Sequence, residues 1–363
     1  MADRPVNFSA GPAILPASVL EEASKGVLAL ENGLSVLEIS HRSKEFEAIL
    51  DDAKTRLRRL LSVPDTHEVL FLQGGASGQF AQVPLNFLGD RSAGYVLSGV
   101  WSKKALAEAK RLGRAEAIAS TADVNFSELP SLQGIDLPTD TAYVHTTSNN
   151  TIYGTQWRDL PSFGAIPHVC DMSSDILSRP LEVSRFSLIY AGAQKNAGPA
   201  GVTIVVIERA WAASAREDIP AIWRYQTHVE GDSLYHTPPA FGIYCVGLTA
   251  RWVEEQGGLE GMAKLNEAKA ALLYDAIDGS DGFYRATVTR REDRSLMNVT
   301  FRLETEALEK RFLEVATAAG LDGLKGHRSV GGLRASIYNA MPPAGIERLV
   351  DLMQRFRKDP DGV

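Results

Sequence analysis

The lysine at position 195 is the residue of the chain best suited to covalent chemistry. It lies in a loop of small residues, "AQKNAGPAG", directly before the β-branched run at residues 202–207, which is typical of a buried strand. Lysine is among the residue types least often buried, so a solvated side chain is the ordinary interpretation. A lysine in a poorly solvated cleft loses its proton more readily and can then condense with an aldehyde.

A carboxylate upstream of this lysine could be its partner. Asp171 follows the apolar residues "HVC" and is separated from Lys195 by one predicted strand. A carboxylate that emerges from a buried strand needs a cation or hydrogen-bond donors, because it would otherwise take up a proton. A helix N-cap or a structural ion pair would also explain it.

Two further features have a chemical interpretation beside a structural one. The turn Gly74-Gly75-Ala76-Ser77-Gly78 follows an apolar run, and successive N–H groups at a helix start can hold a phosphate, although such turns are common. Trp101 follows the next strand and offers a flat ring, or simply core packing. The turn matches neither the P-loop nor the G-x-S-x-G pattern.

Chemistry on pyridoxal 5'-phosphate requires four groups together: a lysine for the Schiff base, an acid for the pyridinium nitrogen, a flat group over the ring and a cradle for the phosphate. The chain has a candidate for each, and every candidate follows a different predicted strand. Ligands of open α/β sheets bind at the carboxyl ends of the strands. The sequence therefore predicts a pyridoxal-phosphate site that contains Lys195, Asp171, Trp101 and residues 74–77.

Two His-Arg pairs form a second group of candidates. They are His41-Arg42 and His327-Arg328, and Arg334 lies close to the second pair in the sequence. Arginine binds carboxylate or phosphate through two parallel hydrogen bonds, so these residues could hold a doubly anionic substrate. The alternative is that they are solvated surface charges.

The elements that would position these residues indicate an α/β fold. Strands that are apolar on both faces and separated by helices predict a mostly parallel sheet between helix layers. We expect a large cofactor-binding domain at residues 1–256, whose first ~15 residues can pack on a smaller α+β domain at residues 257–363. The expected strands of the large domain fall within residues 68–75, 94–99, 141–150, 167–175, 186–195 and 202–208.

Composition narrows the class of protein. The chain has 363 residues and a formal net charge of -7, and a mildly acidic surface argues against general nucleic-acid binding. Cys170 and Cys245 form no metal-ligand pattern and no disulfide framework. The N-terminus lacks a secretion signal, and no apolar run approaches the length of a membrane span. We expect a soluble cytoplasmic protein.

Several strings together resemble a known family. They include "NFSAGPAILP", "LQGGASGQF", "TTSNNTIYGTQW", "AGAQKNAGPAG" and "GGLRASIYNA", and the similarity extends from residue 7 to about residue 342. On these strings the chain is identified as a member of the phosphoserine aminotransferase family, within the class V group of the aspartate aminotransferase fold. The last two strings are the most diagnostic.

The resemblance implies a homodimer that uses pyridoxal phosphate to exchange an amino group between L-glutamate and 3-phosphohydroxypyruvate in serine biosynthesis. It also implies a related step on 3-hydroxy-2-oxo-4-phosphonooxybutanoate in pyridoxine biosynthesis. By resemblance, Lys195 forms the Schiff base, Asp171 meets the pyridine nitrogen, Trp101 stacks on the ring and Thr151 contacts the cofactor beside its phenolic oxygen. The phosphate of the cofactor would be held by Ala76, Ser77 and Gln194, with His236 and Thr237 of the other subunit. Arg334 would bind the substrate α-carboxylate, and His41, Arg42, His327 and Arg328 would surround the phosphate or the glutamate side chain.

Two departures from the family pattern affect the phosphate contacts. His236 stands where many members have asparagine, and Ser77 where some have arginine. A histidine donates from both nitrogens only when protonated, so the phosphate grip could depend on pH. The remaining alternatives are another class V enzyme, such as an alanine–glyoxylate (serine–pyruvate type) aminotransferase or a cysteine desulfurase, and a non-catalytic protein that keeps the fold.

Overall fold

A seven-stranded sheet forms the centre of the larger part of the molecule. The computed structural model describes residues 4–362, and the strand order is β2-β8-β7-β6-β5-β3-β4. Strand β8 is antiparallel to both of its neighbours, whereas the other pairs are parallel. The bounds are β2 His67–Leu72, β3 Ser92–Leu97, β4 Arg114–Ser120, β5 Thr141–Thr147, β6 His168–Asp171, β7 Leu188–Gly192 and β8 Thr203–Glu208.

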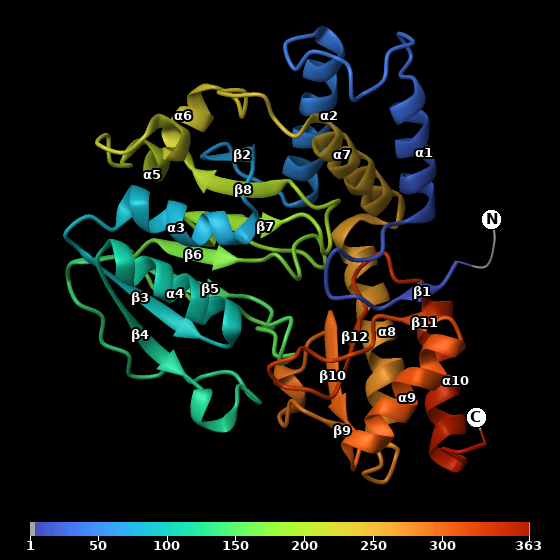
Figure 1. Ribbon diagram of the computed structural model, residues 1–363. Helices are drawn as coiled ribbons and strands as arrows, with labels where there is room; N and C mark the ends of the chain where they lie inside the picture. The colour runs from blue at the N-terminus through green and yellow to red at the C-terminus, as the bar shows by residue number, and fades with distance from the viewer. Residues whose placement is uncertain (1–3, 363) are drawn as a thin grey trace.

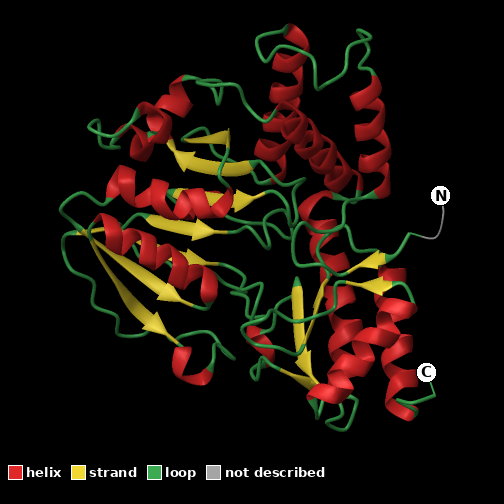
Figure 2. Cartoon of the chain, in the orientation of Figure 1, coloured by secondary structure: helices red, strands yellow, loops and turns green. Residues whose placement is uncertain are grey.

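Helices cover both faces of this sheet (Figures 1 and 2). In β7, Ile189 and Ala191 pack into one apolar core, while Leu188 and Tyr190 face another. Successive side chains of a strand point to opposite faces, so burial on both sides explains the continuous apolar runs. The helices of this part are α1 Ala17–Leu28, α2 Lys44–Leu60, α3 Gly75–Phe87, α4 Val100–Leu112, α5 Arg209–Ala213, α6 Tyr225–Glu230 and α7 Ala240–Glu255.

The smaller part has its own core and two small sheets. The antiparallel sheet has the order β12-β10-β9, and β1 near the N-terminus pairs in parallel with β11. Helices α8, α9 and α10 lie beside these strands (Figure 1). The bounds are β1 Val6–Asn7, α8 Gly258–Asp278, β9 Arg285–Ala286, β10 Asn298–Arg302, α9 Glu306–Ala318, β11 Leu321–Asp322, β12 Leu333–Ser336 and α10 Pro343–Lys358.

The predicted α/β fold with a mostly parallel sheet is confirmed, and the domain boundary after residue 256 stays a prediction. Ser43 is the N-cap of helix α2, and its side chain accepts a hydrogen bond from the Phe46 N–H at 3.3 Å. We assigned no strand to residues 114–120, which form β4 at the sheet edge. Among the described residues, no helix combines the length and apolarity needed to cross a membrane.

Candidate active site

Lys195 lies in the turn that follows β7, at the carboxyl end of that strand. Its ammonium group donates hydrogen bonds to Thr151 Oγ1 at 2.6 Å and to Ser174 Oγ at 3.0 Å. Both hydroxyls lie in loops that follow neighbouring strands, β5 and β6. The lysine is therefore held by polar residues at the carboxyl ends of the strands instead of extending into solvent.

The surroundings of Lys195 favour the neutral amine. The pKa of Lys195 is lowered to about 8, mainly by burial and in part by the nearby charge of Arg334. The carboxylates of Asp171 and Asp175 act in the opposite direction, because an adjacent negative charge stabilises the ammonium form. Desolvation outweighs the carboxylates, so a much larger fraction of this amine than of a solvated lysine is neutral near pH 7.

Asp171 ends β6, between Thr147 of β5 and Tyr190 of β7 in the sheet register. Its side chain is buried, and Oδ1 accepts a hydrogen bond from the Ser173 N–H at 2.9 Å. Burial raises the pKa of Asp171, while the charge of Lys195 and the bonds from Ser173 oppose that rise. The carboxylate is thus poorly solvated and suited to hold a protonated ring nitrogen.

Trp101 lies in the first turn of α4, directly after β3. The Lys195 Nζ is 5.4 Å from the centroid of its ring, and the indole Nε1 is buried without a hydrogen-bond partner among the described residues. A buried indole N–H usually has a partner. The ring therefore stands beside the lysine, with a donor left for a bound molecule.

The turn before α3 has the geometry of an anion cradle. Gly74 and Gly75 have φ values of 92° and 61°, which side chains with a Cβ rarely adopt, and an added Cβ at Gly75 would meet nothing within 4 Å. The first turn of α3, which contains Ala76 and Ser77, holds no acidic residue. Free N–H groups and the helix dipole at this open position favour a phosphate.

His236 of the same chain lies beside this cradle. Its Nε2 is 3.1 Å from Oε1 of Gln73, the residue that precedes Gly74, and its Nδ1 is buried without a partner among residues 4–362. Thr237 is exposed. The Gln194 side chain packs over Gly192, where an added Cβ would lie 2.6 Å from Gln194 Oε1.

Arg334 comes from β12 of the smaller part and reaches the same site. Its Nη1 donates to the Thr151 carbonyl at 3.2 Å, so one residue contacts both Arg334 and Lys195. The Arg334 Nε is buried and unpartnered within the described chain, and burial lowers the pKa of the guanidinium. A substrate carboxylate would supply the missing acceptor.

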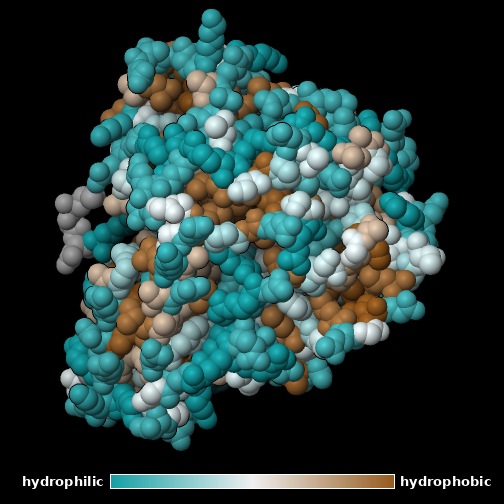
Figure 3. All heavy atoms as spheres, turned by 180° about the vertical axis from the view of Figure 1, so that it is seen from behind, coloured by the Kyte–Doolittle hydropathy of each residue, from teal (hydrophilic) through white to brown (hydrophobic). Residues whose placement is uncertain are grey.

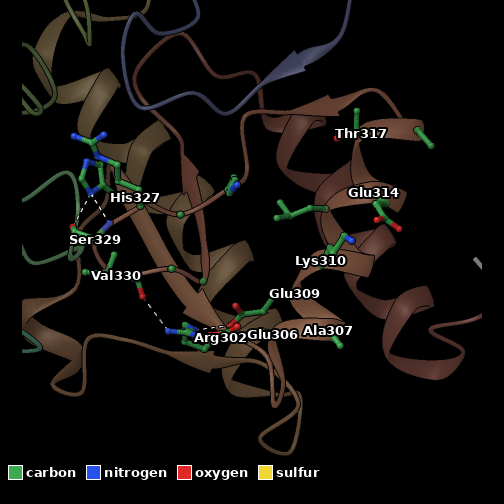
Figure 4. Close-up of a pocket in the computed structure, with 17 residues that line it drawn as sticks. Arg302, Glu306, Ala307, Glu309, Lys310, Glu314, Thr317, His327, Ser329 and Val330 are labelled. Atoms are coloured by element: carbon green, nitrogen blue, oxygen red, sulfur yellow. Dashed lines mark hydrogen bonds and ion pairs between the residues drawn. The ribbon is translucent and has the colours of Figure 1, made fainter.

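His327 and Arg328 line a separate cavity of about 1380 Å³, between α9 and the loop at residues 325–332. Figure 4 shows His327 and Ser329 on one side of this cavity and Lys310 with Glu314 of α9 on the other. The pKa of His327 is lowered by desolvation first and then by the charge of Arg334. The loop that carries this pair leads directly into β12, the strand that carries Arg334.

His41 and Arg42 lie elsewhere, in the loop between α1 and α2 at the top of Figure 1. The Arg42 backbone N–H donates to Ser40 Oγ at 3.2 Å, and no described hydrogen bond joins either residue to Lys195, Asp171 or Arg334. A single chain therefore does not bring the two His-Arg pairs together.

Sequence reasoning missed Ser174 and Asp175. Ser174 contacts the lysine amine directly, and Asp175 is buried, accepting hydrogen bonds from Ser148 and Gln156. The string "DMSSD" carried a signal, because hydroxyl and acidic residues after a buried strand are candidates for a site at its carboxyl end.

These residues fit pyridoxal 5'-phosphate. The cofactor would meet an amine with a lowered pKa, a buried carboxylate, an aromatic ring and an open helix start, all at one edge of the sheet. The unpartnered Trp101 Nε1 and Arg334 Nε indicate space for polar groups that the chain does not provide.

Comparison with known proteins agrees with this fold. The family model described as aminotransferase class-V matches residues 6–349, and the chain belongs to this family, within the group of the phosphoserine aminotransferases. It is 52% identical to the phosphoserine aminotransferase of Lysinibacillus sphaericus, over 99% of each chain.

Solved structures of this group superimpose closely. The phosphoserine aminotransferase of Bacillus circulans subsp. alkalophilus has a TM-score of 0.97 and 50% identity, covering 99% of this chain and 100% of the other. A pyridoxal-phosphate-bound phosphoserine aminotransferase from Trichomonas vaginalis has a TM-score of 0.92 and 38% identity, covering 97% and 100%. The family resemblance seen in the sequence is confirmed.

Proposed function

We propose that the chain is a pyridoxal-phosphate-dependent transaminase that exchanges an amino group between L-glutamate and 3-phosphohydroxypyruvate, which yields O-phospho-L-serine and 2-oxoglutarate. The observation that carries this proposal is the convergence of Lys195 and Arg334 on Thr151. A nucleophilic amine and a carboxylate-binding guanidinium there share one contact residue. Relatives with this activity in their names match the chain over its whole length.

Pyridoxal phosphate, when bound, supplies a reactive aldehyde carbon and a ring that accepts electrons. Residues from five segments, each at or after the carboxyl end of a strand, would hold it. Trp101 and Thr151 would contact the ring, Asp171 the ring nitrogen, and Lys195 the aldehyde carbon. The phosphate would lie against Ala76, Ser77 and Gln194. The family resemblance implies His236 and Thr237 of a second subunit as further contacts, although His236 of the same chain already contacts Gln73 before the cradle.

The chain's own residues would move and hold protons around the substrate. Lys195 would act as general base at the substrate Cα in one half-reaction and as general acid at that carbon in the other. Thr151 and Ser174 direct its Nζ through the two hydrogen bonds described above. Asp171 keeps a proton on the ring nitrogen, and Arg334 orients the α-carboxylate.

The two His-Arg pairs would recognise the second anionic group of each substrate. His327 and Arg328 lie in the loop that leads into the strand of Arg334, whereas His41 and Arg42 lie in the loop between α1 and α2. A homodimer would bring the second pair from the partner subunit. Exposed leucines on α1 and its following loop support such an interface: Leu28 is 81%, Leu34 51% and Leu37 62% exposed.

Figure 3 shows apolar surface interspersed with polar residues on the rear face of the molecule. Sedimentation equilibrium tests the dimer, and a monomer at micromolar concentration would contradict it.

We also expect the protein in the cytoplasm. Activity on 3-hydroxy-2-oxo-4-phosphonooxybutanoate stays a prediction, which the transamination assay below can test.

A substrate panel tests the proposed reaction. With glutamate as donor, kcat/KM should be at least ~100-fold higher for 3-phosphohydroxypyruvate than for hydroxypyruvate, pyruvate or glyoxylate, because the phosphate forms charge-assisted hydrogen bonds that the other acids lack. Arg328→Gln should reduce that preference, whereas Arg355→Gln on the exposed face of α10 should not. Equal use of glyoxylate would favour the alanine–glyoxylate alternative, which the relatives do not support.

A further inference from the structure

A buried polar cluster joins three segments that carry active-site groups. It consists of Asn196, Asn266, Asn339 and Lys269, and we call it the asparagine junction. All four side chains are almost fully inaccessible; Asn266 is 0% and Lys269 1% exposed. Burying polar groups is costly unless they are hydrogen-bonded, so an apolar contact would serve packing more simply.

Asn339 is the centre of the junction. Its backbone N–H donates to Asn196 Oδ1 at 2.9 Å, and its Nδ2 donates to the Leu177 carbonyl at 2.8 Å. Its Oδ1 accepts a hydrogen bond from Asn266 Nδ2 at 2.8 Å. One residue thereby connects the segment after β12, the turn after β7, the loop after β6 and helix α8.

The bonds of the junction end next to the catalytic groups. Asn196 is the neighbour of Lys195, and its Nδ2 donates to the Ile176 carbonyl at 2.6 Å. Ile176 and Leu177 belong to the loop that begins after Asp171. Leu177 has a φ of 62°, which is rare for a bulky residue and persists only where surrounding contacts hold it.

Lys269 fixes the other side of the junction. Its Nζ donates to the carbonyls of Ile337 at 3.0 Å and Tyr338 at 2.7 Å, directly after the strand that carries Arg334. No acidic side chain of the described chain forms a salt bridge with it. The Lys269 amine therefore binds backbone carbonyls instead of a counter-charge, and it links the segment after β12 to α8.

We propose that the asparagine junction positions Arg334 relative to Lys195, so that a carboxylate bound by the arginine lies within reach of the lysine amine. This inference rests on the proposed function for the role of Arg334. Asn339 and its partners act through other residues and do not touch the substrate. They are positioning residues.

The test compares Asn339→Ala with a matched control. Asn86 is also a fully buried asparagine with three hydrogen bonds, to Gln82 O at 2.8 Å, to Trp223 O at 2.7 Å and from the Tyr225 N–H at 3.0 Å. None of these bonds ends on a segment that carries Lys195, Asp171 or Arg334. Asn86→Ala should therefore lower the stability of the fold, as the loss of any buried, hydrogen-bonded amide does, without moving Arg334.

Two measurements separate positioning from stability. In the holoenzyme, Asn339→Ala should raise KM for glutamate ~10-fold or more, because small displacements of a binding group cost large factors, while Asn86→Ala should keep KM within about twofold of the parent. In the cofactor-free protein, the pH midpoint for reductive methylation of Lys195 should rise in Asn339→Ala, because Arg334 would no longer stand close to the amine. It should stay unchanged in Asn86→Ala.

The second measurement does not depend on the substrate, so a failed substrate panel would overturn the proposed function without deciding the junction. If Asn339→Ala does not fold, Asn266→Ala replaces it, since the hydrogen bonds of Asn266 Nδ2 within residues 4–362 go to Asn339 Oδ1 and, at 3.1 Å, to Ser178 O. An unchanged KM and midpoint in the folded variant, or equal changes in Asn86→Ala, would overturn the inference.

Discussion

The amine of Lys195 allows a quantitative prediction. Burial lowers its pKa from 10.5 to about 8. At pH 7 about 9% of this amine would be neutral, against about 0.03% of a lysine that titrates at 10.5, which is a ratio of about 300. Only the neutral amine reacts with a carbonyl compound, so the pH at which the reaction rate reaches half of its maximum reports the pKa of the amine.

Reductive methylation of the cofactor-free protein measures this difference. Formaldehyde and cyanoborohydride are applied at a series of pH values, and the methylated peptides are quantified by mass spectrometry, with Nα-acetyl-lysine as reference. The Lys195 peptide should reach half of its maximal rate near pH 8. Lys269 serves as an internal control: burial also lowers its pKa, to about 7, but its amine is inaccessible and bonded to carbonyls, so it should remain unmodified.

Charge-changing variants give the sign of each neighbour's effect. Arg334→Gln should raise the midpoint of Lys195, because the guanidinium destabilises the ammonium form. Asp171→Asn should lower it, because the carboxylate stabilises that form. A parent midpoint above pH 10, or shifts of the same sign in both variants, would refute the electrostatic account of the site.

Three further substitutions test separate parts of the account. Lys195→Ala should abolish transamination while the fold remains, as seen by circular dichroism; near-normal turnover would rule out the assigned role. Asp171→Ala should bind the cofactor more weakly and lower kcat by roughly 100-fold or more, since it removes a fixed charge from a water-poor site, and full activity would contradict that role. Ser43→Ala should lower the free energy of unfolding by about 1 kcal/mol through loss of the α2 cap, measured by urea denaturation with Ser43→Gly as a milder change; an unchanged midpoint would show that the cap contributes nothing.

The central strands were predictable because burial on both faces leaves a continuous apolar signature. Residues 202–207 and 186–192 carried that signature and became β8 and β7. The direction of β8 was hidden, since a buried antiparallel strand has the same pattern as a buried parallel one. β4 was missed because it lies at the end of the strand order, beside β3, and none of its residues is buried, so it lacks a continuous apolar run.

Some residues of the candidate site were also predictable from local sequence patterns, and others were not. Lys195, Asp171 and Trp101 were predicted to meet because each follows a strand of one sheet, and the structure places them together. Arg334 comes from another part of the fold, and only the family resemblance connected it to the lysine. The contacts of Asn339 with Asn196 and Asn266 depend on how the two parts pack, for which local sequence patterns carry no signal.

Covalent attachment of the cofactor at position 195 is the claim on which the account depends. The protein loaded with pyridoxal phosphate is reduced with borohydride, digested and mapped by mass spectrometry. We expect the cofactor-derived mass on the peptide that contains Lys195 and on no other. A label on a different lysine, or no label in a protein that still transaminates, would contradict the account.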